Sequence, residues 1–210
     1  MEPKDLALKE RIIAEAGRQF LKYGFRKTTM GEVATGLKLS KKTLYRFFTN
    51  KRELFKQTAL FHLNQIEKQF ALILKNRNMD FGETLVQAMQ VLATKIKEVG
   101  NFLREELIYE PGLLKGILEQ RERIIISFFR SLFRQGRRKG YIRKTLKEEI
   151  FLTILLTILQ SLFEPTKLAE LPFSSVELFN QVVQIMLFGL LSSKGQAELN
   201  LTGFKEFRLI

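Results

Sequence analysis

The chain has 210 residues, of which 45% are hydrophobic, which is enough for one large domain with a buried core or for a small domain joined to a larger one. Cysteine and tryptophan are absent, so the sequence excludes a disulfide framework and any site that needs a thiolate. The 35 Lys and Arg residues outnumber the 22 Asp and Glu residues, and the net charge of +13 favours polyanionic partners.

The basic excess is concentrated near the N-terminus. Residues 1–51 hold 12 cations and 5 anions, a net charge of +7, whereas residues 52–210 hold 23 and 17, a net charge of +6 over three times the length. The first residues lack the apolar core of a signal peptide. The longest apolar run, residues 150–163, falls short of the ~20 residues that cross a bilayer. We therefore expect a cytoplasmic protein with no membrane partner.

Residues 4–23 are predicted to form an amphipathic helix. Its apolar face consists of Ile12, Ile13, Ala16 and Phe20. Gly24 follows and supplies the left-handed conformation that commonly ends a helix. The apolar face needs partner elements, and the next two predicted helices are the nearest candidates.

Residues 28–54 predict two short helices joined by a tight turn. In the first, apolar residues recur at the spacing of one helix face, at Met30, Val33, Ala34 and Leu37. Thr29 and Ser40 are placed to cap the two N-termini. The second helix buries Leu44, Phe47 and Phe48. Its outer face carries basic and hydroxyl-bearing side chains, those of Lys41, Lys42, Thr43, Tyr45 and Arg46.

This pattern predicts a helix-turn-helix, because a basic helix of this kind fits the ~12 Å major groove of B-DNA. The alternative is an ordinary helical hairpin with a solvated basic face. Together with the first helix, the pair makes a three-helix unit of about 50 residues, which would be marginally stable alone.

Residues 51–75 continue a helical pattern without a break. At ~1.5 Å per residue this helix is nearly 40 Å long, too long for the small N-terminal unit, so we expect it to lead into a larger domain and to couple the two. Further helices are predicted at residues 82–99, 101–109 and 113–139, the last of which ends at Gly140.

Two strongly apolar helices are predicted at residues 146–163 and 174–191, separated by Pro165 and Pro172. Both are too apolar to be covered on one side only, which predicts that a second subunit buries the surplus. Residues 195–210 show no clear period, and no structure is predicted for them. The sequence contains no convincing strand and no internal repeat.

The order TT..EVA....LS..TLYRFF..K.EL, which runs from Thr28 to Leu54, resembles the DNA-binding signature of the TetR family of bacterial transcriptional regulators. It covers roughly the first quarter of the chain. The matching positions are Thr28, Thr29, Val33, Ala34, Leu39, Ser40, Thr43, Leu44, Tyr45, Phe48, Lys51, Glu53 and Leu54.

Two positions depart from the family pattern. Lys38 occupies the turn site where the family usually has glycine, and a left-handed Lys38 would cost about 1 kcal/mol relative to glycine. Lys42 stands where a small residue is common, which adds a cation and makes a phosphate contact plausible there.

The resemblance implies an all-α protein of about nine helices. It places a helix-turn-helix DNA-binding domain at residues 1–50 and a helical ligand-binding and dimerisation domain at residues 51–194, followed by the tail 195–210. The function it implies is that of a homodimeric regulator, most often a repressor, which a small hydrophobic effector releases from a palindromic, double-stranded DNA operator.

Nine residues are predicted to contact DNA: Thr28, Thr29, Ser40, Lys41, Lys42, Thr43, Tyr45, Arg46 and Lys51. Arg46 and Lys41 are the candidates for base edges, since their donors suit the N7 and O6 acceptors of guanine. Phosphate contacts are expected from Lys42, Tyr45, Thr28, Thr43 and Lys51.

The larger domain holds most of the 19 Phe residues, which hints at a hydrophobic ligand, although such residues are more often simple core. The candidate ligand-binding residues are Phe102, Tyr109, Phe128, Thr157 and Gln160. The candidate dimer-interface residues are Ile154, Ile158, Leu178, Val182 and Ile185. The polar stripe of Thr153, Thr157, Gln160 and Glu164 lines a ligand cavity, lies in the subunit interface or faces water.

No catalytic constellation, metal-ligating cluster or cofactor motif occurs, so we expect neither an enzyme nor a bound metal or cofactor. The lone His62 is expected to have no special role. A basic run, Arg134, Arg137, Arg138, Lys139, Arg143, Lys144 and Lys147, is a second anion-binding patch or, more simply, a set of cations that offsets a helix macrodipole. Two rival functions remain: a DNA-binding dimer with no effector, and a helical lipid or acyl-chain carrier with a basic surface.

Overall fold

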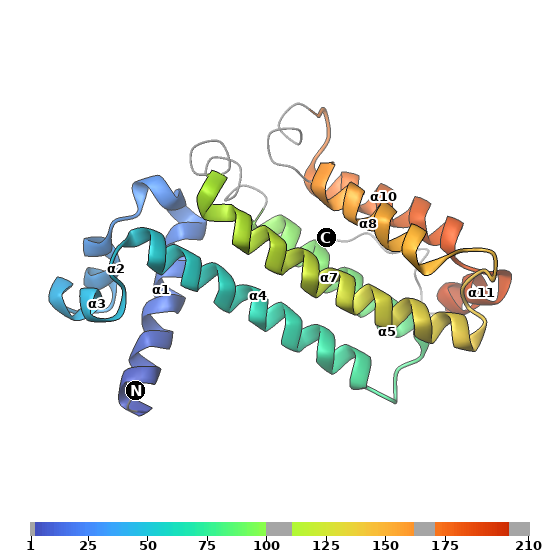
Figure 1. Cartoon of the computed structure of the whole chain (residues 1–210), viewed down its shortest axis with the longest axis horizontal. Helices are drawn as coiled ribbons and strands as arrows, with labels where there is room; N and C mark the ends of the chain where they lie inside the picture. The colour runs from blue at the N-terminus through green and yellow to red at the C-terminus, as the bar shows by residue number, and fades with distance from the viewer. Residues whose placement is uncertain (1–2, 100–110, 162–170, 202–210) are drawn as a thin grey trace. The chain divides into compact units, whose positions relative to one another are not determined.

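The computed structural model describes residues 3–99, 111–161 and 171–201, and these ranges are almost entirely helical (Figure 1). Their helices are α1 (Pro3–Lys27), α2 (Met30–Gly36), α3 (Lys41–Phe47), α4 (Lys51–Lys75), α5 (Phe81–Val99), α7 (Pro111–Lys139), α8 (Glu148–Ser161), α10 (Ser175–Leu190) and α11 (Ser193–Leu201). The described ranges contain no strand beyond one isolated bridge between Ile142 and Leu191. The all-α prediction is confirmed, whereas the helix predicted at 101–109 lies outside the described residues.

The chain divides into two compact units. The first takes Met1–Gln65 and Asn101–Arg121, and the second takes Ile66–Gly100 and Glu122–Ile210. The division therefore falls within α4, after Gln65, and not at residue 50, where the sequence analysis places the domain boundary. The reason lies in the first turns of α4, whose Leu54 and Phe55 are fully buried in the core of the first unit.

An aromatic cluster holds α1 against α4 in the first unit. The ring of Phe55 meets those of Phe20 and Phe25 edge-on, with centroids 5.2 and 5.1 Å apart. Nearby, a Cβ on Gly17 would lie 2.6 Å from Nε2 of His62, so the two helices approach closely there. Gln19 is buried and donates to the backbone oxygen of Glu32, which ties α1 to α2.

The second unit surrounds α5. Buried residues of α5, such as Phe81, Leu85 and Met89, face the rest of the unit, and α5 packs against both α10 and α11. Phe128 of α7 stacks on Phe70 of α4, with ring centroids 4.2 Å apart. Figure 1 shows α8 and α10 running side by side at the outside of this unit.

The helix ends agree with the glycine signals in the sequence. Gly24 has φ 79° inside the span of α1 and interrupts it, and Gly140 has φ 78° directly after α7. Both positive φ angles favour glycine, as the sequence predicts.

The tail 195–210, to which the sequence analysis assigned no structure, begins within a helix, α11. α11 is short and has no apolar period of its own, which is why its sequence gave no signal. Neighbouring groups hold it instead: Ser192 Oγ accepts from Gly195 N–H, and the Tyr141 hydroxyl bonds Glu198 at 3.1 Å. A Cβ on Gly195 would strike the backbone oxygen of Tyr141, so only glycine allows this approach.

Candidate nucleic-acid interface and apolar pocket

The first helix of the predicted helix-turn-helix has a complete capping box. Thr29 Oγ1 accepts from the Glu32 N–H at 3.2 Å, and Glu32 accepts from the Thr29 N–H at 2.8 Å. The Thr29 hydroxyl also donates to the Glu32 carboxylate at 2.8 Å, and this bond together with that from the Thr29 N–H lowers the pKa of Glu32. The predicted Thr29 cap is confirmed, and it fixes where the chain enters α2.

The turn between α2 and α3 passes through a left-handed lysine. Lys38 has φ 56°, the conformation that the family pattern assigns to glycine. The backbone N–H groups on both sides of it are satisfied, because Leu37 and Leu39 both donate to the Ala34 oxygen. The turn is thus formed without glycine, at a cost of about 1 kcal/mol.

The second helix has the predicted Ser40 cap and two of its three predicted anchors, whereas Phe47, also predicted to be buried, is only half-buried. Ser40 Oγ accepts from the Thr43 N–H at 3.0 Å, and its oxygen lies 2.9 Å from the Thr43 hydroxyl. Leu44 and Phe48 are fully buried, which fixes the rotation of α3 about its axis. Lys41, Lys42, Tyr45 and Arg46 are consequently exposed on its outer side. The structure therefore presents a cationic, hydroxyl-bearing helix face to solvent.

Arg46 has a partner that the sequence analysis did not find. Its Nη2 donates to Asp5 Oδ1 at 2.7 Å, and this bond links α3 to the first turn of α1. The guanidinium also lies over the Phe47 ring, 4.7 Å from its centroid. Both contacts restrict where the guanidinium points, while its remaining donors stay available to another acceptor.

Thr28 and Lys51 lie differently from the other predicted DNA contacts. Thr28 is buried, and its hydroxyl donates to the Gly24 oxygen at 2.9 Å. Lys51 Nζ donates to the Phe25 oxygen at 2.9 Å and lies over the Phe25 ring. These two side chains hold the end of α1 in place.

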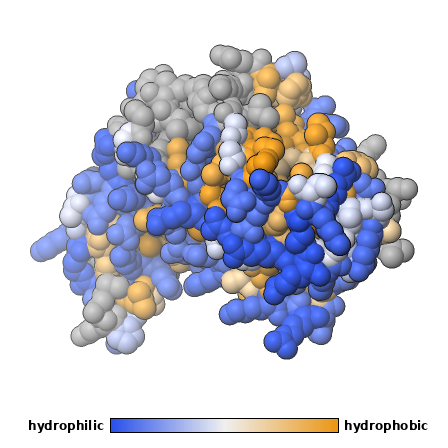
Figure 2. Space-filling view, turned by 45° about the vertical axis from the view of Figure 1, so that its right-hand side comes forward, coloured by the Kyte–Doolittle hydropathy of each residue, from blue (hydrophilic) through white to orange (hydrophobic). Residues whose placement is uncertain are grey.

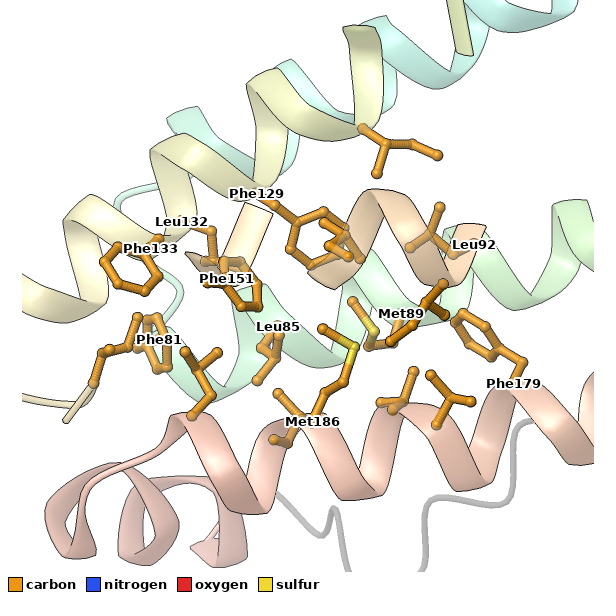
Figure 3. A pocket seen from close by; sticks show the side chains of 18 residues that line it. Phe81, Leu85, Met89, Leu92, Phe129, Leu132, Phe133, Phe151, Phe179 and Met186 are labelled. Atoms are coloured by element: carbon orange, nitrogen blue, oxygen red, sulfur yellow. The ribbon is translucent and has the colours of Figure 1, made fainter. Parts of the chain in front are cut away.

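An apolar pocket of about 60 Å³ lies inside the second unit (Figure 3). Seventeen residues from α5, α7, α8 and α10, together with Ile142, line it, and none has a nitrogen or oxygen atom in its side chain. Figure 3 shows Phe129 and Leu132 on one side, Met186 and Phe179 on the opposite side, and Leu85 and Met89 between them. Such a wall suits an uncharged, hydrocarbon-rich group and offers a charge no compensation.

Of the predicted ligand-binding residues, the three that the structure describes, Phe128, Thr157 and Gln160, do not line this pocket. Phe128 is buried but belongs to the stack with Phe70, and Thr157 and Gln160 are exposed. Phe102 and Tyr109 lie outside the described residues. Gln160 donates to Glu122 at 3.1 Å, and Thr157 donates to the Thr153 oxygen, so both polar groups are used on the surface of α8. The lining residues recur at helical spacing, for example Phe151, Leu155 and Ile158. This period is the one feature of the sequence that could have identified them as lining residues.

The outer sides of α8 and α10 expose large apolar side chains. Ile154 is 48% exposed and Ile150 53% on α8, and Ile185 is 70% exposed and Phe188 66% on α10. Figure 2 shows orange apolar surface gathered over this part of the second unit. Ile154 and Ile185 were predicted interface residues, whereas Ile158, Leu178 and Val182 are half-buried.

Three of the seven cations in the basic run around the end of α7 make structural contacts. Arg134 binds Glu148 with two donors, at 2.9 Å each. Arg137 donates to the backbone oxygens of Lys144 and Leu146, and Arg143 donates to those of Phe188 and Leu191. These contacts give three of the cations a structural role in holding helix ends and loops together, which the sequence analysis did not predict.

Residues 12–58 match the sequence profile described as bacterial regulatory proteins of the tetR family. A curated relative from Bacillus subtilis (strain 168), described as the uncharacterized HTH-type transcriptional regulator YhgD, is 27% identical over 138 residues, 64% of this chain and 72% of that protein.

Solved structures share the fold. The fatty acid degradation regulator FadR from Bacillus halodurans is similar with a TM-score of 0.65 and 15% identity, over 89% of this chain and 96% of that chain. A transcriptional regulator of the TetR/AcrR family from Thermobifida fusca YX-ER1 is similar with a TM-score of 0.62 and 18% identity, over 86% and 97%. Among residues 3–99, 111–161 and 171–201, no helix combines the length and apolar character that a bilayer span requires.

Proposed function

This chain is a DNA-binding transcriptional regulator of the TetR family, and we propose that it acts as a homodimeric repressor that a small hydrophobic effector releases from a palindromic operator. The observation that carries the DNA-binding half is the exposed face of α3, where Lys41, Lys42, Tyr45 and Arg46 stand on a helix fixed by a cap and a buried anchor. As a regulator of bacterial DNA, it would work in the cytoplasm.

A division of contacts follows from the chemistry of this face. Arg46 and Lys41 supply donors that suit guanine, and Lys42, Tyr45 and Thr43 supply contacts to phosphates. The hydroxyls of Thr29 and Ser40 cap α2 and α3, so their contribution to DNA binding is to fix where these two helices begin. Thr28 and Lys51 support DNA binding by holding α1 and α4 in place.

A homodimer is supported by the exposed apolar stripe of Ile150, Ile154, Ile185 and Phe188, which we call the α8/α10 face. Members of the TetR family act as dimers. Apolar side chains of this size, gathered on two adjacent helices, are typical of a permanent subunit interface. A two-fold dimer presents two α3 helices, and so it reads two half-sites about 34–36 Å apart or a multiple of that distance.

The effector half is supported by the apolar pocket of the second unit. Its wall lacks polar side-chain atoms, which favours a hydrophobic ligand. Its volume of about 60 Å³ favours a second candidate function, a dimeric DNA-binding regulator with no small-molecule effector, because ligand pockets usually measure about 300–1,000 Å³.

Selection from a library of random DNA duplexes tests the DNA-binding half and yields the operator sequence in the same experiment. The purified protein should enrich duplexes with two inverted half-sites, and a Lys41→Ala, Arg46→Ala double variant should not enrich the same sequence. Recovery of unrelated duplexes by the wild-type protein would contradict sequence-specific binding.

A further inference from the structure

Half of the pocket wall is formed by α8 and α10. The lining residues of these helices are Phe151, Leu155, Ile158, Phe179, Val182, Val183, Met186, Leu187 and Leu190. The other half comes from α5, α7 and Ile142. Within the described part of the chain, no residue of α4 lines the pocket. A ligand in the pocket therefore touches α8 and α10 directly and reaches α4 only through other elements.

The same two helices carry the α8/α10 face on their opposite side. Leu187 faces the pocket while the adjacent Phe188 is 66% exposed, and Leu155 faces the pocket while the adjacent Ile154 is 48% exposed. Each helix is thus a single layer between the pocket and the surface on which we place the second subunit. A shift of this layer changes both surfaces at once, because packed helices move as rigid elements.

The other two walls are backed by the protein itself. α5 also packs against α11, and Phe128 of α7 stacks on Phe70 of α4. The outer sides of α8 and α10, in contrast, have solvent-exposed apolar residues in the monomer. When a ligand exceeds the available volume, α8 and α10 are the walls that yield.

We propose that the effector acts through the subunit interface: an uncharged, hydrocarbon-rich ligand enters the pocket between α5, α7, α8 and α10, displaces the latter two helices and weakens the dimer. This inference rests on the proposed function, since it takes the α8/α10 face as the interface and the pocket as the effector site. The partner subunit braces α8 and α10 from outside, so the dimer binds a large ligand less tightly than the monomer does. By linkage, the ligand then weakens dimerisation by the same factor.

The chemistry of the wall determines the choice of probes. Apolar cavities in proteins bind simple aromatic hydrocarbons. Toluene and benzoate share the same ring, which carries a methyl group in toluene and a carboxylate in benzoate. The wall has no side-chain donor for a carboxylate, so benzoate should bind at least about tenfold more weakly than toluene. Saturation-transfer or relaxation NMR of each probe with the full-length protein measures both affinities.

Sedimentation equilibrium of the wild-type protein, with and without saturating toluene, tests the coupling. The dimer dissociation constant should rise at least about fivefold, which is the low end of typical coupling between two sites. An Ile185→Glu, Phe188→Glu variant, which we expect to be monomeric, should bind toluene at least about fivefold more tightly than the wild-type dimer, as linkage requires.

A filled pocket is the matched control. Leu155→Phe, or Val183→Phe if the first variant does not fold, should lose toluene binding and leave the dimer insensitive to toluene. If toluene binds the wild-type protein but the dissociation constant stays unchanged or falls, coupling through the interface is contradicted while the effector site stands. If neither toluene nor a larger hydrocarbon such as naphthalene binds, the pocket is not an effector site, and the effector part of the proposed function fails.

Discussion

The two exposed faces of this protein have opposite chemistry. The α3 face carries Lys41, Lys42 and Arg46 on a helix held by hydrogen-bonded caps, whereas the α8/α10 face carries aliphatic and aromatic side chains on helices held by apolar packing. A polyanion suits the first, and a second copy of the chain suits the second. The binding of the first partner should fall steeply with salt, while association through the second should not.

The largest effect is expected from placing charge on the α8/α10 face. An Ile185→Glu, Phe188→Glu variant buries two carboxylates per subunit in an apolar interface, so it should be monomeric at concentrations where the wild-type protein is dimeric. Operator affinity should fall at least about 100-fold, since each subunit then binds one half-site alone. Light scattering and a gel-shift titration measure the two effects.

Leu72→Glu is the matched control for that variant. Leu72 of α4 is 69% exposed, almost as much as Ile185 at 70%, but it lies outside the α8/α10 face. The control should stay dimeric and bind the operator normally. Dissociation of both variants would show that the loss follows from added charge in general and not from this face.

The next largest effect separates the roles of two residues on α3. Arg46→Ala should cost about 1–3 kcal/mol per half-site on the operator and relax the choice of one base, with little change on random DNA. Lys42→Ala should weaken binding to operator and random DNA alike, and the slope of log K against log salt should become shallower by roughly 2 for a dimer. Titrations of both duplexes at several salt concentrations measure these changes.

Two further variants serve as comparisons for Arg46→Ala and Lys42→Ala. Tyr45→Phe removes one hydroxyl and keeps the ring, so it should cost less than either change. Asp5→Asn removes the ion-pair partner of Arg46, which is 2.7 Å away, and keeps Arg46 itself. If Arg46→Ala lowers both affinities equally and Lys42→Ala lowers only that for the operator, the two roles are reversed.

A smaller effect concerns the stability of the first unit. Thr29→Ala removes a cap whose hydroxyl accepts from the Glu32 N–H, and such changes cost about 0.5–2 kcal/mol. Thr29→Ser keeps the hydroxyl and serves as the control. Chemical denaturation should place Thr29→Ser within a few tenths of a kcal/mol of the wild-type protein. Equal stability of Thr29→Ala and the wild-type protein would show that the cap contributes nothing in solution.

Lys38→Gly should stabilise the protein by up to about 1 kcal/mol, because it removes a side chain from a residue with φ 56°. The gain is reduced by the larger entropy that glycine gives the unfolded chain. Lys38→Ala keeps the unfavourable conformation without the charge, and it should not stabilise. If the denaturation midpoint rises equally for Lys38→Gly and Lys38→Ala, the stabilisation comes from removal of the lysine charge and not from the backbone conformation.

The smallest effect is expected from acid. The capping bonds lower the pKa of Glu32 in the folded state, so its contribution to stability is fully present above its ordinary pKa and is lost as pH falls through the lowered value. A Glu32→Gln variant should therefore lose less stability than the wild-type protein between neutral pH and pH 3, measured by denaturation at each pH. Identical pH profiles would show that Glu32 is not stabilised in its ionised form.

The first unit was largely predictable because its signals are local. Thr29, Ser40, Gly24 and the left-handed position of Lys38 each act within four residues, and the structure places all of them as the sequence predicts. The Asp5–Arg46 pair spans 41 residues and left no local pattern.

In the second unit, helix positions were predictable and their assembly was not. α5, α7, α8 and α10 begin and end within a few residues of the predicted ranges, because amphipathic periodicity marks each of them. Which apolar side chains enclose a pocket depends on how the helices pack, and Phe128 and Phe129 are equivalent by composition although only Phe129 lines it. α11 was missed because its stability comes from contacts with Tyr141 and α5, which its own sequence does not encode.

The spacing of the half-sites tests the central claim most directly, namely that two α3 faces on one two-fold dimer read one operator. The measurement compares the affinity of the wild-type protein for its selected duplex with that for the same duplex carrying five extra base pairs between the half-sites. Five base pairs turn the second half-site by about half a helical turn, so affinity should fall to that of a duplex with a single half-site. Unchanged affinity for the lengthened duplex would contradict the two-fold dimer as the DNA-binding species.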